Sequence, residues 1–137
     1  MRAGRGGGRA CPRGLAPGSV GPVSASGLAA TRHTTLRAVQ GLTTSQLDYL
    51  HDPQSNTIGA LLGHIAAVEV AYQADTFEGR ALAPRERQEW GTLLDLGERA
   101  RREIRGHPVA YYLHLLQDVR QKTLGEFARR DADWLYE

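Results

Sequence analysis

Cysteine, early acidic residues and long apolar runs are scarce or absent in this 137-residue sequence. The single cysteine, Cys11, has no intrachain partner, which excludes a disulfide framework and is typical of a protein in a reducing cytoplasm. No apolar run approaches the roughly 18 residues that span a membrane, and the start of the chain lacks the apolar segment of a secretory signal. The sequence therefore predicts a cytoplasmic protein without a membrane partner.

Charge is distributed unevenly along the chain. No acidic residue precedes Asp48, although six of the seventeen Lys and Arg residues do. From Asp48 onward the carboxylates outnumber the basic side chains, so the net charge of +2 comes from the beginning of the chain. A mildly acidic main part argues against the basic surface of a nucleic-acid-binding domain, and we expect no nucleic-acid partner.

The first 26 residues differ in composition from the remainder. Residues 1–26 are rich in Gly, Arg and Pro and contain almost no large apolar side chains to offset the entropy of ordering them. One short GRGGGR segment is a weak signal for RNA binding, and an organellar transit peptide would need an amphipathic helix that this stretch lacks. We predict a disordered leader over residues 1–26 and a single domain over residues 27–137.

The longest periodic segment is predicted to be a helix over residues 56–79. Asn56 or Thr57 is suited to cap its start, and Gly79 follows its last periodic residue. Its large apolar residues recur at helical spacing and predict one inward face: Ile58, Leu61, Leu62, Ile65, Val68, Tyr72 and Thr76. His64 lies at the border of this face, where the simplest interpretation is a histidine bonded to a neighbouring carbonyl.

Three further helices and one short helical turn are predicted by periodicity and by breakers. The helices cover about residues 27–40, 83–104 and 108–130, with Pro84 suited to open the second of them. The turn lies in the segment after Gly41, which Pro53 ends. No pair among His33, His51, His107 and His114 has a spacing that commits it to one site. The residues alone leave catalytic and cofactor-binding positions unassigned.

The helix around His64 resembles the second helix of the DinB/YfiT-like superfamily. The resemblance is carried by Ile58, Leu61 and Leu62 ahead of His64, with Glu69 five residues later. A "gL-T-x-x-Q-L" segment after Gly41 and a "D-x-D-x-L" segment from Asp131 extend it over about residues 30–137. The resemblance implies an all-α, up-down bundle of DinB-like topology, here with three long helices and one connecting helix and without the fourth long helix.

The same resemblance implies a role for His64 as the first of three metal ligands. The superfamily takes the other two from an H-x-x-x-H pair on its fourth helix, and this sequence has no such pair. The implied cofactor is a divalent transition metal such as Zn or Ni, which lowers the pKa of a bound small thiol such as mycothiol or bacillithiol. With His64 alone the site is incomplete, and we expect no tight stoichiometric metal binding if the chain is complete as given.

Two functions of different classes follow from these observations. The first is a metal-dependent thiol S-transferase or isomerase-related domain, inactive or incomplete as given. The second is a non-catalytic helical interaction module, because three amphipathic helices without their fourth expose an apolar groove. Such a groove predicts a homo-oligomer or a partner helix. The first function predicts a small thiol ligand instead.

Overall fold

A computed structural model describes residues 20–131 and 133–136 of the chain. In these two ranges all regular structure is helical, with six α-helices, one 3₁₀ helix and no strand. The elements are α1 Val20–Val39, α2 Thr44–Leu47, α3 Ile58–Glu78, α4 Pro84–Asp95, α5 Gly97–Glu103, α6 Val109–Ala128 and η1 Asp133–Tyr136. The predicted all-α fold is confirmed.

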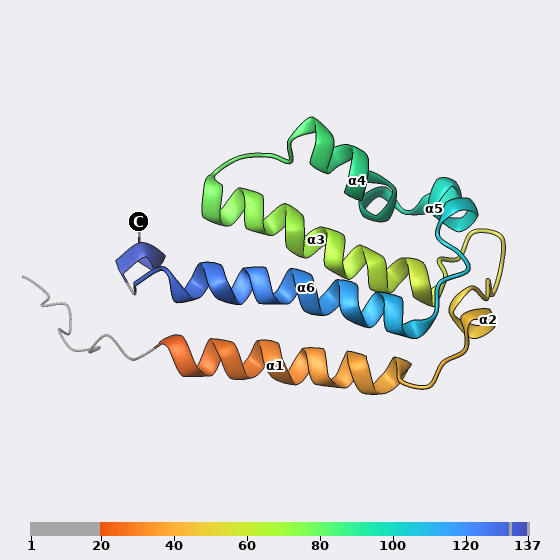
Figure 1. The fold of residues 1–137 in the computed structure, drawn as a ribbon, viewed down its shortest axis with the longest axis horizontal. Helices are drawn as coiled ribbons and strands as arrows, with labels where there is room; N and C mark the ends of the chain where they lie inside the picture. Colours follow the sequence, from red (N-terminus) through yellow and green to blue (C-terminus); the bar gives the residue numbers. More distant parts are fainter. Residues whose placement is uncertain (1–19, 132, 137) are drawn as a thin grey trace, which may run out of the picture.

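Three long helices lie side by side, with α6 between α1 and α3 (Figure 1). Helix α4 packs on the side of α3 that faces away from α6. Helices α3 and α6 run in the same direction and α1 runs against both, because α4 and α5 carry the chain back along α3 before α6 begins (Figure 1). One core joins α1, α2, α3 and α6, and its buried members are Val39, Leu47, Leu62, Ala66, Tyr112, Leu116 and Val119.

Both ends of α3 agree with the sequence prediction. Thr57 is fully buried, and its hydroxyl accepts a hydrogen bond of 3.0 Å from the N–H of Ala60 in the first turn. Gly79 ends the helix in the left-handed region at φ 62°, which a residue with a side chain rarely adopts.

The packed faces of α3 differ from the predicted face. Of the large apolar residues predicted to point inward, only Leu62 is buried, and the other buried positions are small: Gly59, Ala60, Gly63, Ala66, Ala67 and Ala74. The "outer apolar stripe", defined as Ile58, Leu61, Ile65 and Tyr72, is 39–64% exposed. The prediction was wrong because it treated the large residues as the inner face, whereas small residues allow α4 and α6 to approach closely.

The predicted connecting helix over residues 83–104 is two helices. It breaks at Leu96, which takes a positive φ of 55°, and at Gly97, whose φ is 74°. Glycine loses more backbone conformational entropy in a helix than residues with a side chain do, and it adopts a positive φ readily. Gly97 is therefore a favourable point for the chain to turn. The prediction of one connecting helix is therefore corrected to α4 followed by α5.

Helix α1 begins at Val20 instead of near Gly27. Pro22 lies in its first turn, where a backbone N–H would make no intrahelical hydrogen bond, so the lack of one in proline costs nothing there. Gly27 lies inside the helix. The predicted disordered leader of residues 1–26 overlaps this helix from Val20 onward. Its remaining part, including Cys11, lies outside the described residues, and the division into a leader and a domain stays a prediction.

The short turn after Gly41 forms as predicted. Thr43 and Gln46 cap α2 reciprocally, since the Thr43 hydroxyl accepts from the Gln46 N–H at 3.2 Å and Gln46 Oε1 accepts from the Thr43 N–H at 2.9 Å. This exchange gives a physical reason for the spacing of Thr43 and Gln46. Leu47, at the end of the turn, is fully buried in the core.

The ends of α3 and α6 are joined by an aromatic cluster. The rings of Phe77 and Phe127 meet edge to face with centroids 5.0 Å apart. Arg130 lies over Phe77 at 4.5 Å and over Trp134 at 5.0 Å, and it donates to the Phe77 carbonyl. The backbone N–H of Trp134 donates a hydrogen bond of 3.1 Å to the Asp131 carboxylate. None of the helices described here is both long and apolar enough to cross a lipid bilayer.

Two glycines in helices provide a matched test of the close α3–α6 contact. A Cβ on Gly59 would lie 2.6 Å from the Tyr112 hydroxyl oxygen, whereas a Cβ on Gly125 in α6 would meet nothing within 4 Å. We expect Gly59→Ala to lower the free energy of unfolding by about 1–3 kcal/mol through overpacking. Gly125→Ala should raise it by about 0.5–1 kcal/mol through helix propensity. Urea denaturation measures both, and a stabilising Gly59→Ala would contradict the packing described.

Tyr112 provides a test at alkaline pH. Its ring is buried, its hydroxyl has no hydrogen-bond partner among the described residues, and burial, followed by the charges of Asp48 and Tyr111, raises its pKa to about 12. In the unfolded chain the tyrosine ionises near its ordinary pKa of 10, so between pH 10 and 12 the folded chain still holds a proton that the unfolded chain has lost. The stabilisation that comes from this difference is complete below pH 10, and it is lost as the pH rises from 10 to 12.

Tyr112→Phe should therefore leave the free energy of unfolding at neutral pH unchanged or raise it by about 1 kcal/mol, because it removes an unsatisfied buried hydroxyl. It should also remove part of the loss in stability between pH 10 and 12 that wild type shows. Denaturation across this pH range is the measurement, with the exposed Tyr49→Phe as control. A loss above about 1 kcal/mol at neutral pH would mean that the hydroxyl has a partner, such as a buried water.

Candidate functional site

His64 lies on α3 between the face packed on α4 and the outer apolar stripe. Its Nδ1 is 2.8 Å from the carbonyl oxygen of Leu93 in α4, and the side chain is half-buried. Leu93 is in the last turn of α4, where carbonyl groups have no intrahelical N–H to accept from. The histidine therefore satisfies a helix-end carbonyl, which is the arrangement that the simplest interpretation of the sequence predicted.

Close packing of α4 on α3 brings this carbonyl to His64. A Cβ on Gly63 would lie 2.5 Å from a methyl carbon of Leu93, so only glycine leaves room for the Leu93 side chain. Gly63 and Leu93 are both buried. Gly63 thus allows α4 to lie close enough to α3 for the His64 imidazole to contact the backbone of α4.

The bond to Leu93 fixes which nitrogen of His64 carries the proton. A carbonyl oxygen can only accept, so Nδ1 must donate, and in the neutral ring Nε2 keeps its lone pair. Metal-binding histidines are commonly held in this way, with one ring nitrogen bonded to a carbonyl and the other directed at the ion. The same geometry also serves a purely structural histidine.

The described residues do not form a metal site by themselves. No group of three His, Cys, Asp or Glu side chains close enough to hold an ion occurs in residues 20–131 and 133–136, so His64 belongs to no three-ligand cluster there. His33, His51 and His114 are exposed, and His107 stacks on Tyr111 with ring centroids 4.0 Å apart. Three protein donors are the usual minimum for a catalytic zinc site.

Glu69, the acidic residue of the His64 motif, is bound to α6. Its carboxylate faces Arg120, with Oε1 2.9 Å from Nε and Oε2 3.0 Å from Nη2, although Nε is not aligned for a hydrogen bond. The Thr123 hydroxyl donates to Oε1 at 2.6 Å, and Gln73 donates to Thr123 and to the Val119 carbonyl. The Glu69 and Arg120 side chains are only 13% and 20% exposed, so the pair is shielded from water.

A second guanidinium approaches this pair from α1. Arg32 donates from Nη1 to the carbonyl of Leu116 at 3.1 Å, one helical turn before Arg120. Burial lowers the pKa of Arg32 from its ordinary value, the charge of Arg120 lowers it further, and Glu69 opposes both effects. Two cations therefore share one carboxylate in this part of the bundle.

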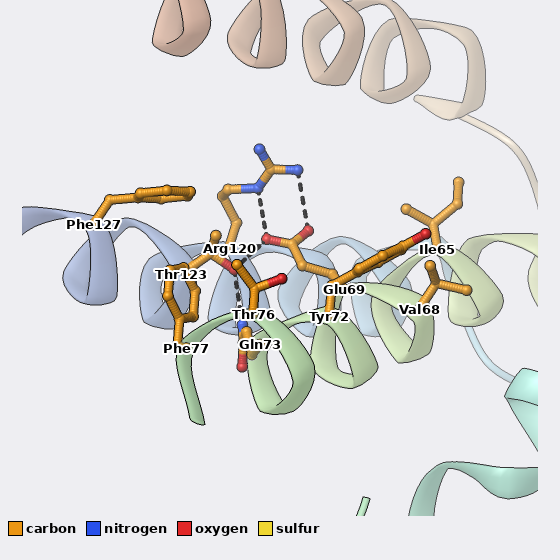
Figure 2. Close-up of a pocket in the computed structure, with 10 residues that line it drawn as sticks. All are labelled: Ile65, Val68, Glu69, Tyr72, Gln73, Thr76, Phe77, Arg120, Thr123 and Phe127. Atoms are coloured by element: carbon orange, nitrogen blue, oxygen red, sulfur yellow. Dashed lines mark hydrogen bonds and ion pairs between the residues drawn. The ribbon is translucent and has the colours of Figure 1, made fainter. Parts of the chain in front are cut away.

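A cavity of about 330 Å³ opens beside the pair, between α3 and α6 (Figure 2). Its wall is mostly apolar, and the polar groups of Glu69, Arg120, Gln73 and Thr123 gather on one side. The remaining lining residues are Ile65, Val68, Tyr72, Thr76, Phe77 and Phe127. An apolar cavity with a few convergent polar groups is the usual form of a small-molecule site.

Sequence reasoning missed the cluster of Arg32, Glu69 and Arg120. One signal was available, because Arg120 and Thr123 follow Leu116 and Val119 at the three- and four-residue spacing of the inward face of α6. Charged residues at inward positions are rare unless they are paired. The partner of Arg120, however, lies fifty-one residues away along the chain, and no local pattern identifies it.

The family model for mycothiol-S-transferase matches residues 25–137. No curated protein matches the chain. The matched region contains nearly all the described residues, including His64, the Glu69–Arg120 pair and the lining of the cavity. Proteins of this DinB-like kind are generally metal-dependent. The match confirms the superfamily that the residues around His64 indicated, and the chain belongs to the mycothiol-S-transferase family.

Proposed function

We propose that this chain is a thiol S-transferase domain in which His64 is the first ligand of a metal site that groups outside the described residues complete. The observation that carries the proposal is the hydrogen bond from His64 to Leu93, which directs a lone pair at Nε2 within a chain of the mycothiol-S-transferase family. A small thiol of the mycothiol or bacillithiol type is the proposed substrate.

The position of His64 beside the outer apolar stripe supports a site completed from outside. Helix α3 packs its buried positions against α4 and α6, whereas the large apolar residues of the outer apolar stripe are 39–64% exposed among the described residues. A helix placed on this stripe would lie next to His64. If it carried two histidines one turn apart, both would face the same way and could join His64 around one ion.

The first test measures the metal content of the purified chain by mass spectrometry. We expect well below one transition metal per protomer, because a single imidazole holds Zn²⁺ or Ni²⁺ only weakly. One metal per protomer that is lost in His64→Ala, but kept in the exposed His114→Ala, would mean that donors within the chain complete the site.

The same test continues with an amphipathic helical peptide that carries an H-x-x-x-H pair. In its presence the chain should take up Zn²⁺ and transfer mycothiol to a chromogenic electrophile, since three imidazoles would then share the ion. His64→Ala should abolish both effects and His114→Ala neither. Zinc uptake that is equal in wild type and His64→Ala would contradict the proposed ligand role.

A second candidate function, a non-catalytic interaction module, is favoured by the outer apolar stripe alone. Ile58, Leu61, Ile65 and Tyr72 lie along one side of α3, and the described residues leave 39–64% of their surface exposed. We propose that a second copy of the chain covers it, because the same stripe on two chains is complementary to itself about a twofold axis.

Sedimentation velocity at micromolar concentration tests this self-association. Wild type should sediment as a dimer, and Leu61→Glu should sediment as a monomer, because dimerisation would bury the new carboxylate without a partner. Tyr49→Ser, which changes an exposed aromatic residue just after α2 and outside the stripe, should leave the dimer intact. A monodisperse wild-type monomer with no dye-accessible apolar surface would count against the module.

A further inference from the structure

The polar cluster between α1, α3 and α6 has one more cation than it has anions. Glu69 is satisfied on both oxygens, by Arg120 and by the Thr123 hydroxyl. Arg32 adds a second positive charge one turn away, where its only hydrogen bond among the described residues goes to the Leu116 carbonyl. Burial, and after it the positive charge of Arg120, lowers the pKa of Arg32. An uncompensated guanidinium in a partly buried place is unfavourable unless an anion approaches it.

The two arginines keep donors for such an anion. Arg120 uses Nε and Nη2 towards Glu69, and Nη1 makes no hydrogen bond within the described part of the chain. Figure 2 shows its guanidinium on the side of α6 that faces α1, the helix that carries Arg32. Residues 1–29 contain no acidic side chain, so that segment cannot supply the missing charge.

The adjoining cavity suits the body of a small ligand. Ile65, Val68, Tyr72 and Phe127 form an apolar wall next to the arginine side, and about 330 Å³ is within the range of small-molecule pockets. An aromatic or aliphatic body would lie against this wall. The charged group of the ligand would then reach the guanidinium of Arg120. The guanidinium of Arg32, which approaches from α1, would add a second positive charge near that group.

We propose that this cavity binds a small carboxylate with an apolar body, whose anionic group is held by Arg120 and Arg32 and whose body lies against Tyr72 and Phe127. Guanidinium groups present planar pairs of donors that match a carboxylate, which is why this anion is the one specified. The site uses neither His64 nor a metal. It goes beyond the proposed thiol transfer, and the two proposals can fail separately.

Isothermal titration calorimetry of the full chain with phenylacetate tests the site. Phenylacetamide, which has nearly the same shape but no charge, is the matched probe. Phenylacetate should bind and phenylacetamide should bind at least about tenfold more weakly, because only the anion makes charge-assisted hydrogen bonds. Equal binding of the two probes, or no binding of phenylacetate, would overturn the proposal.

Two variants locate the binding. Arg32→Gln should weaken phenylacetate binding by about tenfold, whereas Arg37→Gln, which removes the same charge from an exposed position of α1, should leave it unchanged. If circular dichroism shows that Arg32→Gln does not fold, phenylacetate binding to Tyr72→Ala is measured instead and should also be weaker than in wild type. Tyr72 is 64% exposed, so this substitution does not disturb the core. Unchanged affinity in a folded Arg32→Gln, or in Tyr72→Ala, would place the ligand elsewhere and contradict the proposal.

Discussion

Close contact of α3 with two neighbours is the constraint on which the remaining structure depends. Gly59 touches Tyr112 of α6 and Gly63 touches Leu93 of α4, so a side chain at either position would push a helix away. The separation of α3 and α6 sets the reach of Glu69 to Arg120, and the separation of α3 and α4 sets the reach of His64 to Leu93. Both candidate sites therefore rest on positions where the chain has no side chain at all.

The two sites lie on different sides of α3 and have different physical character. His64 belongs to a helix-end hydrogen bond, where one proton position is fixed and one lone pair remains. Glu69 belongs to a shielded ion pair in which every carboxylate oxygen is satisfied. A position five residues further along a helix is rotated by about 140°, so the two residues of one motif serve different surfaces. Membership of the mycothiol-S-transferase family bears on the His64 site and leaves the Glu69–Arg120 site unexplained.

The outer apolar stripe borders both sites. Ile65 belongs to the stripe and to the cavity wall, and it is the neighbour of His64 in the sequence. A partner that covered the stripe would thus change the solvent access of the imidazole and of the cavity together. The metal proposal, the self-association proposal and the carboxylate site therefore concern different sides of α3 that meet along this stripe.

Local sequence determined the helices and several of their ends. Thr57 and Gly79 bound α3 because capping and a left-handed glycine are properties of a few adjacent residues, and the exchange between Thr43 and Gln46 is equally local. The break at Leu96 and Gly97 was missed because periodicity continued through it, and the start of α1 at Val20 because Gly27 is a weak breaker. The motif around His64 also sufficed to indicate the superfamily, which the family match confirmed.

Tertiary structure alone decided which faces are buried and which charges meet. Large apolar residues at helical spacing indicate an amphipathic helix, but they do not say which side a neighbour will cover, and on α3 the small residues were covered instead. Arg32, Glu69 and Arg120 come from three helices, and their meeting depends on how those helices pack. Spacing along one helix fixes directions within that helix, whereas an ion pair or a cavity between helices depends on distances that only packing sets.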